Sequence, residues 1–184
     1  MRTKNIEVER LDALRRYNIL DTPPDGTFDR ITLLASKIFN MPIAIISLVD
    51  HDRIWFKSHH GLEDVKQIGR DPGLCASVIL SQDVYIVENA LQDPRCLANP
   101  LVCGEFGLRF YAAAPLRTKD GHNVGTLCII DKKQRYIIHQ QKEILQELAA
   151  IVVDEMELRL AARNTIEEKD RRISELEEKL NSKN

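Results

Sequence analysis

The chain has 184 residues, 43% of them hydrophobic, which is enough for one domain with a buried core and an extension. Its 26 Lys and Arg against 28 Asp and Glu give a formal net charge of -2, which argues against a general nucleic-acid partner. Its apolar runs are far shorter than the roughly 20 residues that cross a bilayer, and no signal-type segment follows Met1, so we expect a cytoplasmic protein without a membrane partner.

The N-terminal part of the chain is predicted to be helical. Apolar residues recur three or four positions apart over residues 8–17 and again over residues 28–39, so each stretch has one face that can pack on a core. A third, short helix is expected at residues 75–80.

Five short apolar runs predict strands, at residues 43–49, 54–59, 84–88, 108–116 and 124–130. Asp120-Gly121 lies between the last two runs and is typical of a tight hairpin turn, so these two strands are predicted to be antiparallel neighbours. Helices before, between and after the strands indicate an α+β fold.

A long loop, residues 92–107, separates the third and fourth predicted strands. Its Asp-Pro and Asn-Pro pairs are turn formers, and loops of this length often cover binding sites. Arg95 and Arg109 could hold an anion, but a bracing ion pair with Asp93 or Asp131 is the better interpretation.

The end of the chain is predicted to be one long helix, since no proline or glycine follows Gly125. A heptad pattern indicates a parallel coiled coil, and so a homodimer, with the seam Leu145, Val152, Ile166, Ile173 and Leu180 at one position and Leu148, Ala162 and Leu176 at the other. Glu155, Arg159 and Lys169 interrupt this seam. A solvated charged tail and a seam that shifts after Leu148 stay open as alternatives.

Seven segments in order resemble the GAF domain of bacterial sensory proteins: LDTP (20–23), PIAIISLVD (42–50), RIWFK (53–57), DPR (93–95), NPLV (99–102), RFYAAAPL (109–116) and GTLCIID (125–131). The resemblance implies a sheet of about six strands, helices from both termini on one face, and a pocket on the other face. We therefore expect a GAF domain over residues 1–160 and a projecting signalling helix over residues 161–184.

Members of this family commonly precede histidine kinase or diguanylate cyclase modules, and no such module follows in this sequence. The resemblance therefore implies a non-catalytic sensory domain that binds an unidentified small molecule or dimerises, and passes a signal through the C-terminal helix. The candidate pocket residues, many of which could simply be core, are Ser47, Phe56, Cys75, Val78, Tyr85, Val87, Phe110, Tyr111, Ala113 and Cys128.

Specialised forms of the fold carry a cofactor. Bilin attachment commonly uses a Cys followed by His, and none of the four cysteines here has that neighbour, which argues against a bilin. Haem needs an axial His in the pocket, whereas His59 and His60 end a predicted strand and His122 lies in a hairpin turn. No metal-ligand spacing is present, so no metal site is predicted.

One catalytic alternative remains. Free methionine sulfoxide reductases have this fold, and Cys75 and Cys96 roughly occupy the positions of their reactive cysteines. The same pair could act as a thiol redox sensor. Cys75 could equally be a small hydrophobic residue in a buried helix.

Overall fold

The computed structural model describes residues 2–63, 65–71 and 73–181, and its sheet confirms the predicted α+β fold. The described strands form one six-stranded antiparallel sheet in the order β3-β2-β1-β6-β5-β4. Their bounds are β1 Ile43–Val49, β2 Arg53–His60, β3 Gln67–Gly69, β4 Tyr85–Val87, β5 Phe110–Arg117 and β6 Asn123–Asp131.

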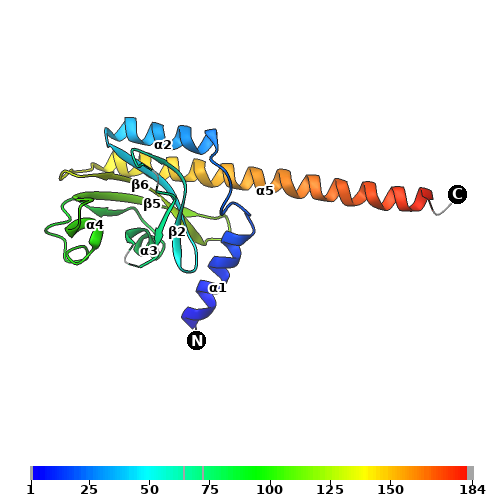
Figure 1. Cartoon of the computed structure of the whole chain (residues 1–184), viewed down its shortest axis with the longest axis horizontal. Coiled ribbons are helices and arrows are strands. Elements are labelled where there is room, and N and C mark those ends of the chain that lie inside the picture. The colour runs from blue at the N-terminus through cyan, green and yellow to red at the C-terminus, as the bar shows by residue number, and fades with distance from the viewer. Residues whose placement is uncertain (1, 64, 72, 182–184) are drawn as a thin grey trace.

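The helices lie on both faces of this sheet (Figure 1). Among them, α2 (Gly26–Phe39) and α5 (His139–Asn181) cover one face, whereas the short α3 (Leu74–Val78) and α4 (Pro100–Cys103) lie over the other. α1 (Arg2–Arg15) packs beside β6 near the edge of the domain. Asp25 caps the N-terminus of α2 by accepting a bond from the Thr27 N–H, at 3.0 Å.

Most of the predicted elements are present. The hairpin prediction is confirmed, since β5 and β6 pair antiparallel from Phe110↔Asp131 to Arg117↔Asn123. β3 and α4 were not predicted from the residues, because three or four residues are too few for a periodic pattern.

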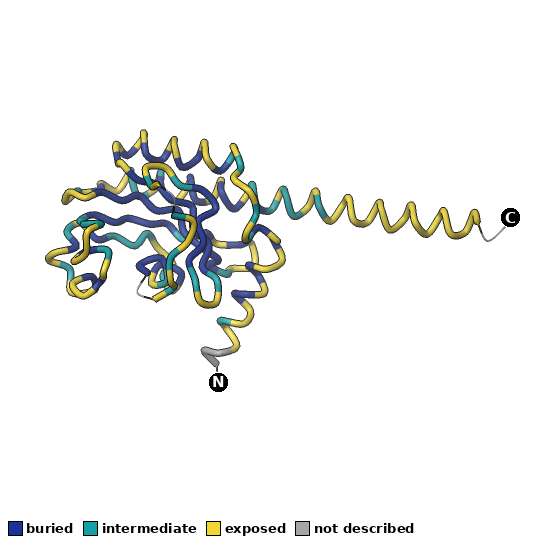
Figure 2. Tube along the Cα trace, in the orientation of Figure 1, coloured by how far each residue is buried: buried dark blue, intermediate teal, exposed yellow. Residues whose placement is uncertain are grey.

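Two apolar cores lie on opposite faces of the sheet, because alternate residues of a strand point to opposite faces. Leu127 and Ile129 of β6 join the core under α2 and α5, while Cys128 and Ile130 join the core under α3 and α4. Figure 2 shows both layers as buried segments on either side of the strands.

α5 has two different halves. Its first half is packed on the sheet through six buried residues, Leu145, Leu148, Ala149, Val152, Val153 and Met156. Farther along, Arg163 donates hydrogen bonds to the carbonyls of Arg16 and Tyr17, at 2.6 and 2.9 Å. Beyond that point the helix projects away from the domain and is exposed along its whole described length (Figure 2). Residues 182–184 of the predicted helix lie outside the described residues.

A helix that crosses a bilayer must be long and apolar over about 20 residues. None of the described helices combines sufficient length with sufficient apolar character to span a membrane.

Candidate functional site

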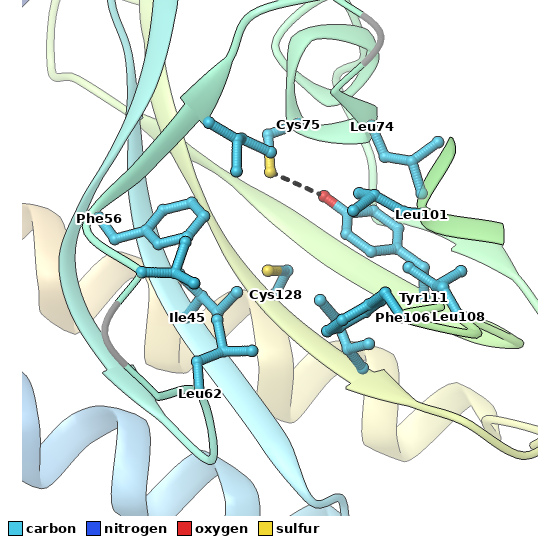
Figure 3. Close-up of a pocket in the computed structure, with 13 residues that line it drawn as sticks. Ile45, Phe56, Leu62, Leu74, Cys75, Leu101, Phe106, Leu108, Tyr111 and Cys128 are labelled. Carbon is cyan, nitrogen blue, oxygen red and sulfur yellow. Dashed lines mark hydrogen bonds between the residues drawn. The ribbon is translucent and has the colours of Figure 1, made fainter. Parts of the chain in front are cut away.

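A cavity of about 160 Å³ lies between the sheet and the segments that cover its second face, the face opposite α2 and α5 (Figure 3). It is lined by Ile45, Phe56, Leu62, Val65, Ile68, Leu74, Cys75, Leu101, Phe106, Leu108, Tyr111, Cys128 and Ile130. The lining side chains are apolar apart from two thiols and one phenol, so the cavity suits a small compound that is mostly apolar.

Strand alternation builds the floor of this cavity. Ile45 of β1 lies directly opposite Cys128 of β6, and Tyr111 of β5 lies opposite Ile130. The roof comes from segments between the strands: the turn after β2, the short helix α3, and the long loop that contains α4. The strands make the floor of the cavity rigid, whereas the loops of the roof can differ in sequence and conformation.

The polar part of the site is a cluster of two thiols and one phenol. The Tyr111 hydroxyl donates to the Cys75 sulfur at 3.3 Å, and Figure 3 shows this contact. Cys128 of β6 lines the same cavity and lies across it from Cys75 (Figure 3). Beneath them the hydroxyls of Ser47 and Thr126 are 2.9 Å apart. Cys75 is thus surrounded by groups that can donate hydrogen bonds to a thiolate.

These neighbours change the ionisation of the cluster. The Cys128 thiol above all, with the hydroxyls of Ser47, Tyr111 and Thr126, lowers the pKa of Cys75 to about 6, although burial opposes the change. The same contact with Cys75, together with burial, raises the pKa of Cys128 well above its ordinary value. Burial and the nearby thiols raise the pKa of Tyr111. Of the two thiols, Cys75 is therefore the more acidic one.

Four of the ten pocket residues named from the sequence line the cavity: Phe56, Cys75, Tyr111 and Cys128. Val78, Val87 and Ala113 are buried in the same core without lining it, and Tyr85 packs on that core with its ring at 71° to Tyr111. Ser47 lies beside the thiols through its pair with Thr126.

Phe110 is a wrong prediction for the pocket. It is fully buried in the core under α2 and α5. Its neighbour Tyr111 lines the cavity, and adjacent residues of a strand cannot point to the same face.

Sequence reasoning missed most of the apolar lining. Ile130 could have been found, since it lies two residues after Cys128 on the same strand. Ile45 shares this face because it pairs with Cys128 across the strands. Leu62, Leu101 and Phe106 come from turns and the long loop, where the sequence has no period that indicates direction.

The catalytic alternative named Cys75 together with Cys96. Cys96 is buried in the same core but is not among the lining residues, and burial raises the pKa of its thiol. The second thiol in the cavity lining is Cys128, one of the pocket residues expected from the sequence. Cys103 is exposed and donates to the Asn99 carbonyl at 3.0 Å.

The long loop is braced as the sequence suggests. Arg95 forms an ion pair with Asp93, while Arg109 donates to the carbonyls of Val102 and Leu108. Asp131 pairs instead with Arg135, at 2.6 Å. These side chains hold the cavity's roof in place rather than forming an anion site.

The seam predicted on the C-terminal helix also needs correction. Leu145, Leu148 and Val152 are buried against the sheet of their own chain, so they cannot face a partner helix. The large apolar side chains left exposed on α5 are Ile151, Leu158, Ile166, Ile173, Leu176 and Leu180, and Ala162 of the predicted seam is exposed as well. The predicted positions from Ile166 onward are therefore available to a partner, and the exposed stripe before them differs from the predicted seam.

No group of three or more His, Cys, Asp or Glu side chains that could hold a metal ion occurs among the described residues. The cavity lining, as far as the structure describes it, contains no histidine. The donor set at hand is therefore limited to the thiols and the phenol.

The GAF domain family model matches residues 23–155 of the chain. A cyclic di-GMP phosphodiesterase of Pseudomonas aeruginosa is 39% identical over 148 residues, which is 80% of this chain and 25% of that protein. The chain thus spans about a quarter of the length of this relative.

Two solved structures show the same fold at low sequence identity. The GAF domain of an Acinetobacter phosphoenolpyruvate-protein phosphotransferase superposes with a TM-score of 0.62 at 18% identity, covering 85% of this chain and 98% of that one. A free methionine-R-sulfoxide reductase of Thermoplasma acidophilum superposes with a TM-score of 0.59 at 16% identity, covering 71% and 90%.

Proposed function

The chain belongs to the GAF domain family, and from this premise we propose that it is a non-catalytic sensory domain that takes a small molecule into its cavity. The signal then leaves through α5 to an output module. Family membership and the likeness to a signalling protein support a regulatory role. The lining is apolar except for one cluster of thiols and a phenol, which supports a ligand that is mostly apolar and carries a polar group.

One observation carries this proposal: the same strand serves the cavity and the helix. Cys128 of β6 lines the cavity, while its neighbours Leu127 and Ile129 pack in the core that holds α5. A ligand that displaces the strand on one face therefore acts on the packing of α5 on the other. Packed elements of this kind move between discrete arrangements, which is how a local event becomes a signal.

The output is proposed to be a cyclic dinucleotide enzyme or a kinase joined to α5. The relative named as a cyclic di-GMP phosphodiesterase supports the first class, and 25% of its length is aligned with this chain. A projecting helix with an exposed apolar stripe gains stability when a second copy covers that stripe. The exposed apolar side chains Ile166, Ile173, Leu176 and Leu180 supply a surface for a second copy of α5.

A native mass spectrum of the freshly purified chain tests both parts of this proposal, because it reports subunit number and any retained compound. The expected result is a dimer with added mass. Leu62→Phe narrows the cavity from its roof and should lower the retained mass, whereas Leu80→Phe, at an exposed position outside the lining, should leave it unchanged. A bare monomer would contradict the ligand and the dimer together.

Methionine sulfoxide reduction is the alternative function, because the cavity contains a thiol of lowered pKa, Cys75, and a reductase shares the fold. Turnover of free methionine sulfoxide with a thiol donor, lost in Cys75→Ser, would establish it. We expect no turnover, since the apolar lining has no charged side chain to hold the ammonium and carboxylate of a free amino acid.

A further inference from the structure

The cavity contains two thiols, which can react covalently and are not needed for reversible binding of a ligand. Cys75 and Cys128 face one cavity from different elements, α3 and β6, and Tyr111 donates to the Cys75 sulfur at 3.3 Å. We propose that these two cysteines are a covalent sensing site, at which an uncharged organic hydroperoxide oxidises Cys75 and the pair then closes to a disulfide. This deepens the proposed function, on which it rests, by naming the class of compound that the cavity takes.

The ionisation of the two thiols divides the roles between them. The pKa of Cys75 is lowered by the groups that can donate hydrogen bonds to it, which favours its thiolate, and thiolates are the reactive form. Cys128 keeps its proton because its pKa is raised. A thiolate beside a protonated thiol is the arrangement needed for attack followed by disulfide closure.

The cavity wall selects the oxidant. The lining residues are apolar apart from the reacting cluster itself, so the organic part of a hydroperoxide gains from burial there. A charged oxidant would lose its hydration without finding a partner of opposite charge in this lining. The exposed Cys103 lies outside this wall and has no such selectivity.

The reaction balances in two steps. The Cys75 thiolate attacks the terminal oxygen of the hydroperoxide, the O–O bond breaks, and sulfur is oxidised to a sulfenic acid. The leaving alkoxide takes a proton from the Tyr111 hydroxyl and departs as an alcohol. The tyrosinate then takes up from solvent one proton, equal to the proton that Cys75 released when it ionised. Cys128 next attacks the Cys75 sulfur, the S–S bond forms, and the hydroxyl leaves as water with the Cys128 proton. One hydroperoxide and two thiols thus give one disulfide, one alcohol and one water.

Oxidation would change how α3 is attached to the sheet. In the reduced chain α3 rests on the sheet through non-covalent contacts, including the Cys75–Tyr111 hydrogen bond. The disulfide would join α3 to β6 covalently and remove the thiolate from the apolar core. Because β6 also packs in the core that holds α5, this change occurs on the path proposed for the signal.

The test treats the reduced full chain with cumene hydroperoxide, quenches with N-ethylmaleimide under denaturing conditions, and maps thiols by peptide mass. Trypsin places Cys75 and Cys128 on separate peptides, with Cys96 and Cys103 together on a third. The expected product is the Cys75 peptide linked to the Cys128 peptide, with both thiols lost to alkylation. In Cys128→Ser, the sulfenic acid on Cys75 should persist and react with dimedone.

Cys103→Ser is the matched control and should form the same linked product. Two outcomes overturn the proposal: Cys75 and Cys128 stay alkylatable at hydroperoxide concentrations that oxidise Cys103, or Cys75 links to the Cys96 peptide instead. Both of these outcomes are measured on the chain without substitutions, so they do not depend on whether a variant folds. A retained compound with unreactive thiols would leave the sensory proposal standing and reject only the covalent one.

Discussion

Arg159 of α5 forms an ion pair with Asp25, the residue that caps α2, although 134 positions separate the two in the chain. Arg159 also binds Glu155 at 2.6 Å, and its guanidinium lies 4.8 Å from the centre of the Phe28 ring. These contacts fix α5 to α2 near the point where α5 leaves the domain. The charged residues that interrupt the heptad pattern at this point therefore have a role within their own chain.

Replacing Arg159 with Met should lower the free energy of unfolding by about 1 kcal/mol at neutral pH, since the pair is only partly buried. Arg159 lowers the pKa of Asp25 to about 2 from an ordinary 3.8. The contribution is therefore complete above the ordinary value and is lost as pH falls through about 2.

Chemical denaturation of both proteins between pH 2 and pH 7 measures this difference. We expect the two curves to converge at the acid end. Arg172→Met removes an exposed pair with Glu175 on the same helix and should have no measurable effect. A constant difference across the pH range would show that Arg159 acts through packing alone.

Gly125→Ala should weaken the pairing of β1 with β6. A Cβ at this position would lie 2.1 Å from the Ser47 carbonyl oxygen, so the two central strands would have to separate. The expected loss is about 1–3 kcal/mol. Gly26→Ala is the control, because its Cβ would meet nothing within 4 Å and alanine favours a helix, so thermal melting should show a small gain.

Substituting Ile173 and Leu176 with Lys should shift the proposed dimer toward monomer, because both side chains are exposed on the projecting part of α5. Sedimentation velocity measures the change. Glu175→Gln with Glu178→Gln alters the net charge by the same amount on the opposite side of the helix and should keep the dimer. An unchanged dimer in the lysine variant would place the interface on another surface.

Tyr111→Phe should raise the pKa of Cys75 above about 6, since it removes a hydrogen bond donated to the thiolate. The ultraviolet absorbance of the thiolate, followed against pH, gives this value directly. Tyr136→Phe, at an exposed position outside the cavity, should leave the titration unchanged. A Cys75 pKa that does not respond would mean that Cys128 and the hydroxyls of Ser47 and Thr126 hold the thiolate without help.

The fold was accessible from the sequence because its strands have clear apolar runs and its hairpin has an Asp-Gly turn. The run at residues 43–49 predicts β1 residue for residue. The short elements β3 and α4 have no period and depend on neighbours far along the chain for their stability.

The site was accessible only in part. Cys75, Tyr111 and Cys128 were named as separate residues, but their contact depends on how α3 settles on the strands, which no local pattern encodes. Phe110 was assigned to the wrong face because an apolar run buried on both faces has no polar residue to mark its alternation. The seam was wrong at Leu145, Leu148 and Val152 because a helix packed on a sheet and a helix in a coiled coil have similar apolar spacing.

α5 is a single helix of 43 residues in which one end belongs to the core. From Leu160 to Asn181 it extends by roughly 33 Å at 1.5 Å rise per residue. A stiff rod of this length is a lever arm: a tilt of about 5° at the core moves its far end by roughly 3 Å. A small tilt of α5 that leaves the core intact can thus produce a large displacement at the C-terminal end of the helix, where another polypeptide would detect it.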